Sequence, residues 1–335
     1  MRLPALLACL LAAGAVSCGG KDKGRDRQVV LYCSADQAIA EPIVAEFEKR
    51  TGIEVLARYD TEQSKTVGLV AKIRAEAGSP AADVFWSNEV FHTVRLAGEG
   101  LLARYDGECV RDWPRRYADP QGRWHGFALR WRVIGYHTAR VSADDAPKSL
   151  EELRDARWKG NIAMARPAFG TTGGDVASWF ARYGPEQARE ILRSLKANGV
   201  RMVDGNSTAV RMVATGQALV CLTDTDDVYA AQRRGWPVAM NPLDQGGRGA
   251  LSIPNTAALV KGGPNPATAR ELMAFLLSDD VEEMLAASDS HNMPIRPALA
   301  KRFAAYAVDK TLDMSYERVA EELPRAIREA GEILP

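Results

Sequence analysis

The sequence has little cysteine, little histidine and no excess of one charge, and each shortage excludes a class of protein. Its 335 residues include five cysteines and four histidines. Apart from the cysteines near the N-terminus, Cys33, Cys109 and Cys221 are too few and too far apart for a disulfide scaffold or a zinc cluster, and at most one disulfide can form among them. Lys and Arg number 43, as do Asp and Glu, without a strong block of one sign beyond the N-terminal segment. This balance excludes a nucleic-acid partner.

Recognisable catalytic motifs are also missing. The chain contains no Gly-x-Ser-x-Gly elbow, no His-Glu-x-x-His, no phosphate-binding P-loop and no Gly-x-Gly-x-x-Gly after a strand. The histidines are scattered without the spacing of metal ligands. We therefore expect a binding protein rather than an enzyme, without a cofactor, and a secreted metal-assisted hydrolase is the rival class.

The apolar run at the N-terminus is too short to cross a membrane. A charged start is followed by apolar residues 3–16 and a small-residue cleavage site, whereas a membrane span needs roughly 20 residues. Charge, apolar core and cleavage site in this order predict a signal peptide over residues 1–17. The following Cys18 resembles the acylated cysteine of bacterial lipoproteins. We therefore expect Cys18 to carry a lipid and residues 18–27 to form a tether.

Alternating strand and helix patterns fill the remainder, and about 310 residues are enough for two lobes. The first block is predicted as strand, helix, strand, helix, strand at residues 29–33, 42–49, 53–59, 66–77 and 82–86. A second block has predicted strands at residues 133–136, 161–164 and 218–222, with helices beginning near 170, 187, 206 and 226. The clearest C-terminal helices are predicted at residues 271–277, 281–287 and 319–330. This alternation predicts an α/β fold with mostly parallel sheets.

Several motifs resemble the periplasmic ferric-iron-binding proteins and their relatives, the solute-binding proteins of ABC importers. They are YCS at 32–34, ADVFW at 82–86, WKG at 158–160, GTT at 170–172, GNS at 205–207 and LTDTDD at 222–227. The resemblance covers roughly residues 28–300. It implies a two-lobe periplasmic binding protein fold, type II-like, in which each lobe is a mixed, mostly parallel sheet flanked by helices and a hinge joins the lobes. We expect lobe 1 to comprise residues 28–127 and about 255–335, and lobe 2 to comprise residues 128–254.

The resemblance also implies a partner and a location. It implies transfer of a small ligand to an ABC permease driven by a cytoplasmic ATPase, although a membrane sensor is an alternative partner. We expect a periplasmic, lipid-anchored monomer. Familiar ferric-binding members hold iron with two adjacent tyrosines after a second-lobe strand, whereas this chain has TDTDD at 223–227, and Tyr229 lies beyond it. The resemblance therefore implies the transport role without those phenolate ligands.

Carboxylates that follow predicted strands supply one candidate site. Asp224, Asp226 and Asp227, with Glu89 from the other lobe, offer hard oxygen ligands for ferric iron or a related metal, and the same carboxylates suit a cationic amine. The alternative is that Asp226 or Asp227 caps a helix and complements its dipole. We expect Asp224 to be the main ligand contact, and Asp224→Ala to weaken binding without unfolding the protein.

Polar side chains at the predicted helix starts supply a second candidate site. Backbone N–H groups at helix starts bind anions, and an arginine can hold an oxyanion with two N–H groups. Ordinary helix caps and ion pairs are the alternatives. A phosphate-, phosphonate- or carboxylate-bearing solute is therefore the alternative to ferric iron, and iron bound with an anion would use both sets. The candidate contacts are Ser34, Asp36, Gln37, Asn88, Glu89, Arg130, Thr171, Thr172, Asn206, Ser207 and Thr225.

Overall fold

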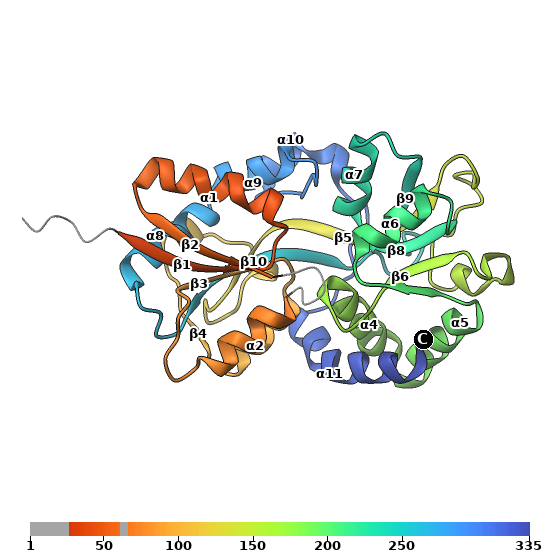
Figure 1. Ribbon diagram of the computed structural model, residues 1–335, viewed down its shortest axis with the longest axis horizontal. Helices are drawn as coiled ribbons and strands as arrows, with labels where there is room; N and C mark the ends of the chain where they lie inside the picture. The colour runs from red at the N-terminus through yellow and green to blue at the C-terminus, as the bar shows by residue number, and fades with distance from the viewer. Residues whose placement is uncertain (1–26, 61–65) are drawn as a thin grey trace, which may run out of the picture.

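A single long strand divides the fold into two lobes. The computed structural model describes residues 27–60 and 66–335, and within them the strands follow the order β2-β1-β3-β10-β5-β8-β6-β7, with β4 beside β10 and β9 beside β5. β5 (His125–His137) is longer than the strand predicted at 133–136. Its residues up to Trp131 pair with β10, and those from Arg132 onward pair with β8 and β9. The two halves of the molecule therefore meet along β5 (Figure 1).

The first lobe has a parallel centre and an antiparallel edge. β1 lies between β2 and β3 and pairs with both in parallel, and β10 pairs antiparallel with β3 and β5. α1 ends at Gly52, whose φ of 66° suits glycine and whose N–H bonds the carbonyl of Glu48. The elements of this lobe are β1 (Gln28–Cys33), α1 (Gln37–Thr51), β2 (Glu54–Tyr59), α2 (Val67–Ala75), β3 (Val84–Ser87), α3 (Phe91–Gly98), β4 (Leu102–Ala103), β10 (Ser252–Val260), α8 (Pro266–Leu276) and α9 (Asp279–Ala287).

The second lobe repeats this plan. β6 pairs in parallel with β7 and β8, while β8 and β9 pair antiparallel with β5. Its elements are β6 (Ile162–Ala165), α4 (Gly170–Tyr183), α5 (Pro185–Ala197), β7 (Arg201–Val203), α6 (Asn206–Ala214), β8 (Val220–Asp224), α7 (Thr225–Arg233) and β9 (Val238–Pro242). Single 3-10 turns lie at Glu108–Val110, Arg115–Tyr117, Glu152–Arg154, Ala156–Trp158 and Ala304–Tyr306. β6 and β8 are buried along their whole length, as strands covered by helices on both faces are.

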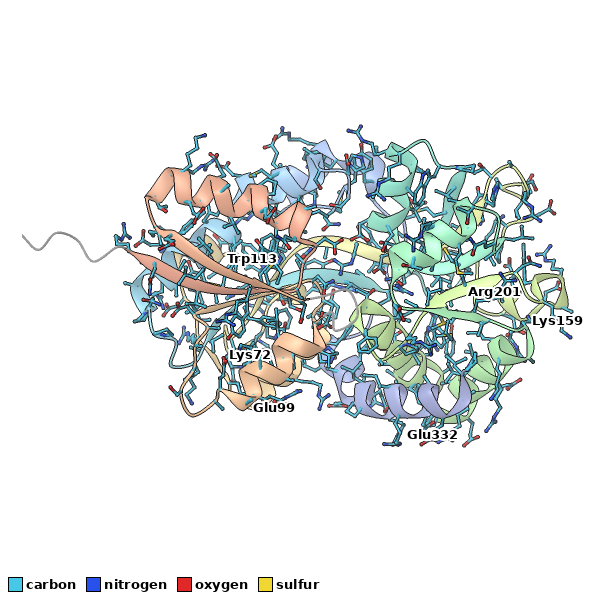
Figure 2. All side chains as sticks on the ribbon, in the orientation of Figure 1. Lys72, Glu99, Trp113, Lys159, Arg201 and Glu332 are labelled. Carbon is cyan, nitrogen blue, oxygen red and sulfur yellow. The ribbon has the colours of Figure 1, made fainter. Side chains whose placement is uncertain are left out.

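The C-terminal helices divide between the lobes. α8 packs against β1, β3 and β10, and α9 packs against α1 and β5. After α10 (Pro297–Arg302), α11 (Tyr316–Ile333) contacts α3 but packs mainly along α4 and α5. Figure 2 accordingly labels Glu332 on the same half of the molecule as Arg201. This position differs from our expectation that residues 255–335 return to lobe 1, because the apolar face of α11 is buried against second-lobe helices.

The N-terminal features predicted from the sequence fall outside the described part of the chain. The signal peptide, Cys18 and all of the tether except Arg27 precede the first described residue. Among the described residues, no helix has the length and apolar character needed to cross a membrane. In this part of the chain, no disulfide joins Cys33, Cys109 and Cys221 to one another.

Candidate functional site

The carboxyl ends of the parallel strands in both lobes meet at one pocket. β1 leads into Asp36 and β3 into Asn88, while β6, β7 and β8 lead into the first residues of α4, α6 and α7. All five connections contribute residues to the pocket lining. The pocket has a volume of about 60 Å³, which is room for a few water-sized groups. Open α/β sheets bind their ligands at this edge.

The pocket brings together most of the polar residues that the sequence singled out. Those that line it are Asp36, Asn88, Arg130, Thr171, Thr172, Asn206, Asp224, Asp226 and Asp227. The lining also includes polar residues that sequence reasoning missed, namely Asp204, Asn255 and Asn292. Asp204 precedes the GNS motif and follows a strand, so its position carried a usable signal. Asn255 lies inside β10 and Asn292 in a loop after α9, where no sequence pattern marks a binding residue.

Glu89 occupies a different position from the one expected of a metal ligand. It is fully buried and does not belong to the described residues that line the pocket. Its carboxylate accepts hydrogen bonds from the backbone N–H of Phe91 at 2.7 Å and of His92 at 3.2 Å, and it lies 3.1 Å from Nδ1 of His92. Glu89 therefore stabilises the start of α3, because its oxygens satisfy N–H groups that have no partner inside the helix.

Four other residues that we predicted as ligand contacts are also not among the described residues that line the pocket. The hydroxyl of Ser34 is buried and accepts a hydrogen bond from the backbone N–H of Asn88 at 2.9 Å, so Ser34 orients a pocket residue. Gln37 is exposed and donates to Glu41 within α1. The Thr225 hydroxyl accepts from the backbone N–H of Trp131 at 3.3 Å and joins α7 to β5. Ser207 is exposed in the first turn of α6.

A buried ion-pair network lies behind the aspartates of the pocket. Arg132 is fully buried and bonds Asp224 at 2.7 Å and Asp175 at 3.0 Å. Asp224 also accepts hydrogen bonds from the hydroxyl of Thr171 at 2.5 Å and from the amide of Asn206 at 3.0 Å. Both oxygens of Asp224 therefore have partners, and these contacts hold β5, β8, α4 and α6 together.

The pKa values of this network follow from burial opposed by charge. Burial raises the pKa of Asp224, but Arg132 and Arg130 outweigh it and hold that pKa below its usual range. Burial lowers the pKa of Arg132, and Asp224 and Asp175 reverse this to a raised pKa. Burial dominates at Asp175, whose pKa is raised despite the contact with Arg132. Arg132 thus stays charged, and Asp224 is its principal counter-ion.

Arg130 connects the lobes at the pocket. Its guanidinium donates to the backbone carbonyl of Asn88 in the first lobe. Its Nε lies 3.4 Å from the carboxylate of Asp224 and 3.7 Å from that of Asp226 in the second lobe. Burial lowers the pKa of Arg130, but the carboxylates around it, foremost Asp226 and Asp224, raise the pKa above its ordinary value. Arg130 therefore places a permanent positive charge at the wall of an otherwise acidic pocket.

The aspartates at the end of β8 and the start of α7 have the spacing of a hard-cation site. Single oxygens of Asp224, Asp226 and Asp227 lie within 4.8 Å of one another. A metal with ligand bonds of about 2.1 Å spans at most about 4.2 Å between two oxygens, so a small inward movement would close this set on an ion. Asp226 and Asp227 are partly exposed and face the pocket, whereas Asp224 is buried. Among the described lining residues there is neither tyrosine nor histidine.

Comparison with known proteins finds a protein family and individual relatives that this chain resembles in sequence. A family model described as bacterial extracellular solute-binding protein matches residues 29–288. "Iron uptake protein A1" of Synechocystis sp. is 25% identical over 323 residues, which cover 92% of this chain and 88% of that protein. A "putative 2-aminoethylphosphonate-binding periplasmic protein" of Salmonella paratyphi A is 27% identical over 258 residues, 75% of this chain and 72% of that protein.

A solved structure shares the arrangement of the lobes. Iron-bound HitA from Pseudomonas aeruginosa superposes with a TM-score of 0.80 at 26% sequence identity, covering 91% of this chain and 99% of HitA. The two-lobe α/β fold predicted from the sequence is therefore confirmed.

Proposed function

Because the chain belongs to the bacterial extracellular solute-binding protein family, we propose that it captures a small ligand between its lobes and delivers it to an ABC importer. The ligand that the pocket suits best is ferric iron, or a related hard cation, bound with a small anion. The observation that carries this proposal is the cluster of Asp224, Asp226 and Asp227 at the start of α7. Ligand release to a permease driven by an ATPase would then follow from opening of the lobes.

The size and charge of the pocket support a compact cation. A volume of about 60 Å³ suits an ion with a few coordinating groups rather than an extended organic chelate. The lining has an excess of negative charge over Arg130, which comes from Asp36, Asp204 and the three aspartates at 224, 226 and 227. Oxygen ligands of this kind favour hard cations. The relative named for iron uptake and the iron-bound structural neighbour make ferric iron the first candidate.

A phosphate-, phosphonate- or carboxylate-bearing organic solute is the second candidate. It is favoured by Arg130 at the pocket wall and by the starts of α4 and α6, which bring Thr171, Thr172 and Asn206 into the lining. Backbone N–H groups at such helix starts attract anions. The relative named for 2-aminoethylphosphonate binding supports this alternative.

We also propose that the protein works outside the cytoplasm as a monomer held to a membrane through a lipid on Cys18. The order of charge, apolar core and cysteine over residues 1–18 supports the lipid. Globomycin treatment should leave the uncleaved precursor, and Cys18→Ala should release the protein from the membrane fraction. A wild-type protein that stays soluble after export would contradict the anchor.

The ligand is tested with the chain starting at Arg27, so that the tether plays no part. Thermal unfolding is measured with ferric iron plus phosphate or citrate, with divalent metals, and with organic phosphates and phosphonates. A ligand at 100 times its Kd stabilises by about 2.7 kcal/mol. Stabilisation by ferric iron that a chelator reverses supports iron transport, whereas stabilisation only by an organic anion favours the second candidate.

A further inference from the structure

Two buried side-chain nitrogens in the pocket wall have no hydrogen-bond partner among the described residues. They are Nε of Arg130 and Nδ2 of Asn292, and both residues line the pocket. Arg130 is 3% exposed and Asn292 is 4% exposed. Buried donors in native proteins nearly always have an acceptor, and a bound group that supplies one is one explanation of an exception. The carboxylates nearest to Nε of Arg130, at 3.4 and 3.7 Å, are ion-pair neighbours but not hydrogen-bond acceptors for it. The position of these two donors points to a ligand with acceptor oxygens.

The orientation of the Asn292 amide follows from a chain of hydrogen bonds. The indole N–H of Trp86 can only donate, and it donates to Oδ1 of Asn255 at 3.2 Å. Nδ2 of Asn255 is therefore the donor to the carbonyl of Ala128 at 2.9 Å and to Oδ1 of Asn292 at 3.2 Å. Because Oδ1 of Asn292 accepts this bond, Nδ2 is the atom of this pocket-lining amide that has no partner among the described residues.

Backbone pairing places Arg130 and Asn292 beside each other. Leu129 and Met293 form an antiparallel bridge and exchange hydrogen bonds of 2.6 and 2.7 Å. Arg130 follows Leu129, and Asn292 precedes Met293, so these two residues stand opposite each other on one face of the bridge. Directly opposed side chains in such a pairing start about 5 Å apart. Arg130 of β5 and Asn292 of the loop after α9 are therefore neighbours in the wall of the pocket.

We propose that Arg130 and Asn292 form a two-donor cradle for an oxyanion of the bound ligand, with Asn255 and Trp86 as positioning residues. This inference rests on the proposed capture of a solute in this pocket. It adds that the wall formed by Arg130 and Asn292 binds the acceptor oxygens of the solute. The cradle lies on β5 and the loop after α9, so it is separate from the helix starts of α4 and α6.

Neighbouring charge narrows the class of ligand that the cradle takes. The carboxylates of Asp224 and Asp226 lie 3.4 and 3.7 Å from Nε of Arg130. They repel a lone anion. The cradle therefore selects an oxyanion that brings a positive charge with it, either a metal ion bound beside the anion or an amine in the same molecule.

The test compares paired and unpaired probes by isothermal titration calorimetry. The paired probes are ferric iron with phosphate, and phosphoethanolamine, which carries an amine and a phosphate. The unpaired probes are inorganic phosphate and ethylamine. We expect at least one paired probe to bind the wild-type protein at least tenfold more tightly than either unpaired probe. Absence of binding by both paired probes would overturn the cradle.

Variants then locate the bound oxyanion. Asn292→Asp keeps the acceptor that Asn255 needs but removes the donor, and Arg130→Lys keeps the charge but removes Nε. Each variant should bind the paired probe at least tenfold more weakly than the wild-type protein. The control is Asn161→Asp, the same change at an amide outside the pocket that donates to the carbonyl of Lys159, and it should leave the affinity unchanged. Full affinity in Asn292→Asp, with a large loss in Thr172→Ala, would place the anion at α4 and overturn the cradle.

A spectroscopic readout separates contact from a structural effect. In ¹⁵N-labelled protein, the side-chain amide signal of Asn292, assigned by its absence in Asn292→Asp, should shift when the paired probe is added. An unmoved signal at saturation would overturn the proposal. If ferric iron binds equally well with and without phosphate in every variant, the cradle is refuted but iron transport is not. If phosphoethanolamine binds through the cradle and iron does not bind at all, the cradle is supported and iron transport is refuted.

Discussion

The guanidinium of Arg132 and the carboxylate of Asp224 lie 2.7 Å apart, and neither side chain is more than 3% exposed. Arg132 belongs to the strand that joins the lobes, and Asp224 ends the strand that leads into α7. This pair ties the geometry of the pocket to the junction between the lobes. It also changes what a substitution at Asp224 is expected to do.

Asp224→Ala should destabilise the fold as well as weaken binding, contrary to our expectation from the sequence. Loss of the carboxylate leaves Arg132 with Asp175 as its remaining counter-ion, and breaking a buried pair from one side costs about 3–5 kcal/mol. Urea unfolding measures the change, and Asp226→Ala, at a partly exposed neighbour, is the control. An unfolding midpoint equal to that of the wild-type protein would refute the structural role of Asp224.

Asp226→Asn combined with Asp227→Asn should abolish cation binding with little effect on stability. Both side chains are partly exposed in the first turn of α7, where the favourable interaction of a carboxylate with the helix dipole is about 0.3–1 kcal/mol. We expect affinity for ferric iron, measured by calorimetry, to fall at least tenfold. Asp279→Asn with Asp280→Asn, in the first turn of α9, is the matched control. Equal affinities in the two double variants would argue against the metal site.

Gly174→Ala should hold the lobes apart. A Cβ at Gly174 in α4 would clash with the ring of Phe91 in α3. This ring is fully buried, so we expect the clash to loosen the contact between the lobes. We expect a larger radius of gyration by small-angle X-ray scattering and at least tenfold weaker binding of any ligand. Gly98→Ala, with nothing within 4 Å of its added Cβ, is the control. An unchanged radius would show that Phe91 moves instead.

Stability should fall between pH 7.5 and pH 5 because of His125. Burial lowers the pKa of His125 to about 4, against a smaller opposing effect of Asp119. The unfolded chain, with a histidine pKa of about 6.5, therefore binds the proton first. Stability from neutral His125 is complete above about pH 6.5 and is lost as pH falls toward 4, with about 2 kcal/mol gone at pH 5.

His125→Phe is the matched variant for this effect, because the ring of His125 packs edge-on against Tyr105 and Trp113 and phenylalanine preserves an aromatic ring there. Urea unfolding at both pH values should show a smaller loss in the variant than in the wild-type protein. The same loss in both proteins would assign the acid sensitivity to other groups.

The sequence alone determined the fold class and the edge of the sheets at which the pocket lies. Strand and helix periodicities are local properties, and the carboxyl ends of parallel strands share one edge, so Asp36, Asn88, Thr171, Asn206 and Asp226 could be assigned to the pocket before any coordinates.

Only the tertiary structure decided which of those polar groups line the pocket and which support the fold. Glu89 is turned onto the start of α3, and Asp224 is buried against Arg132. Asn292 enters the pocket through its pairing beside β5. Sequence cannot reveal these assignments, because the direction and burial of a side chain depend on strand register and on contacts between residues far apart in the chain.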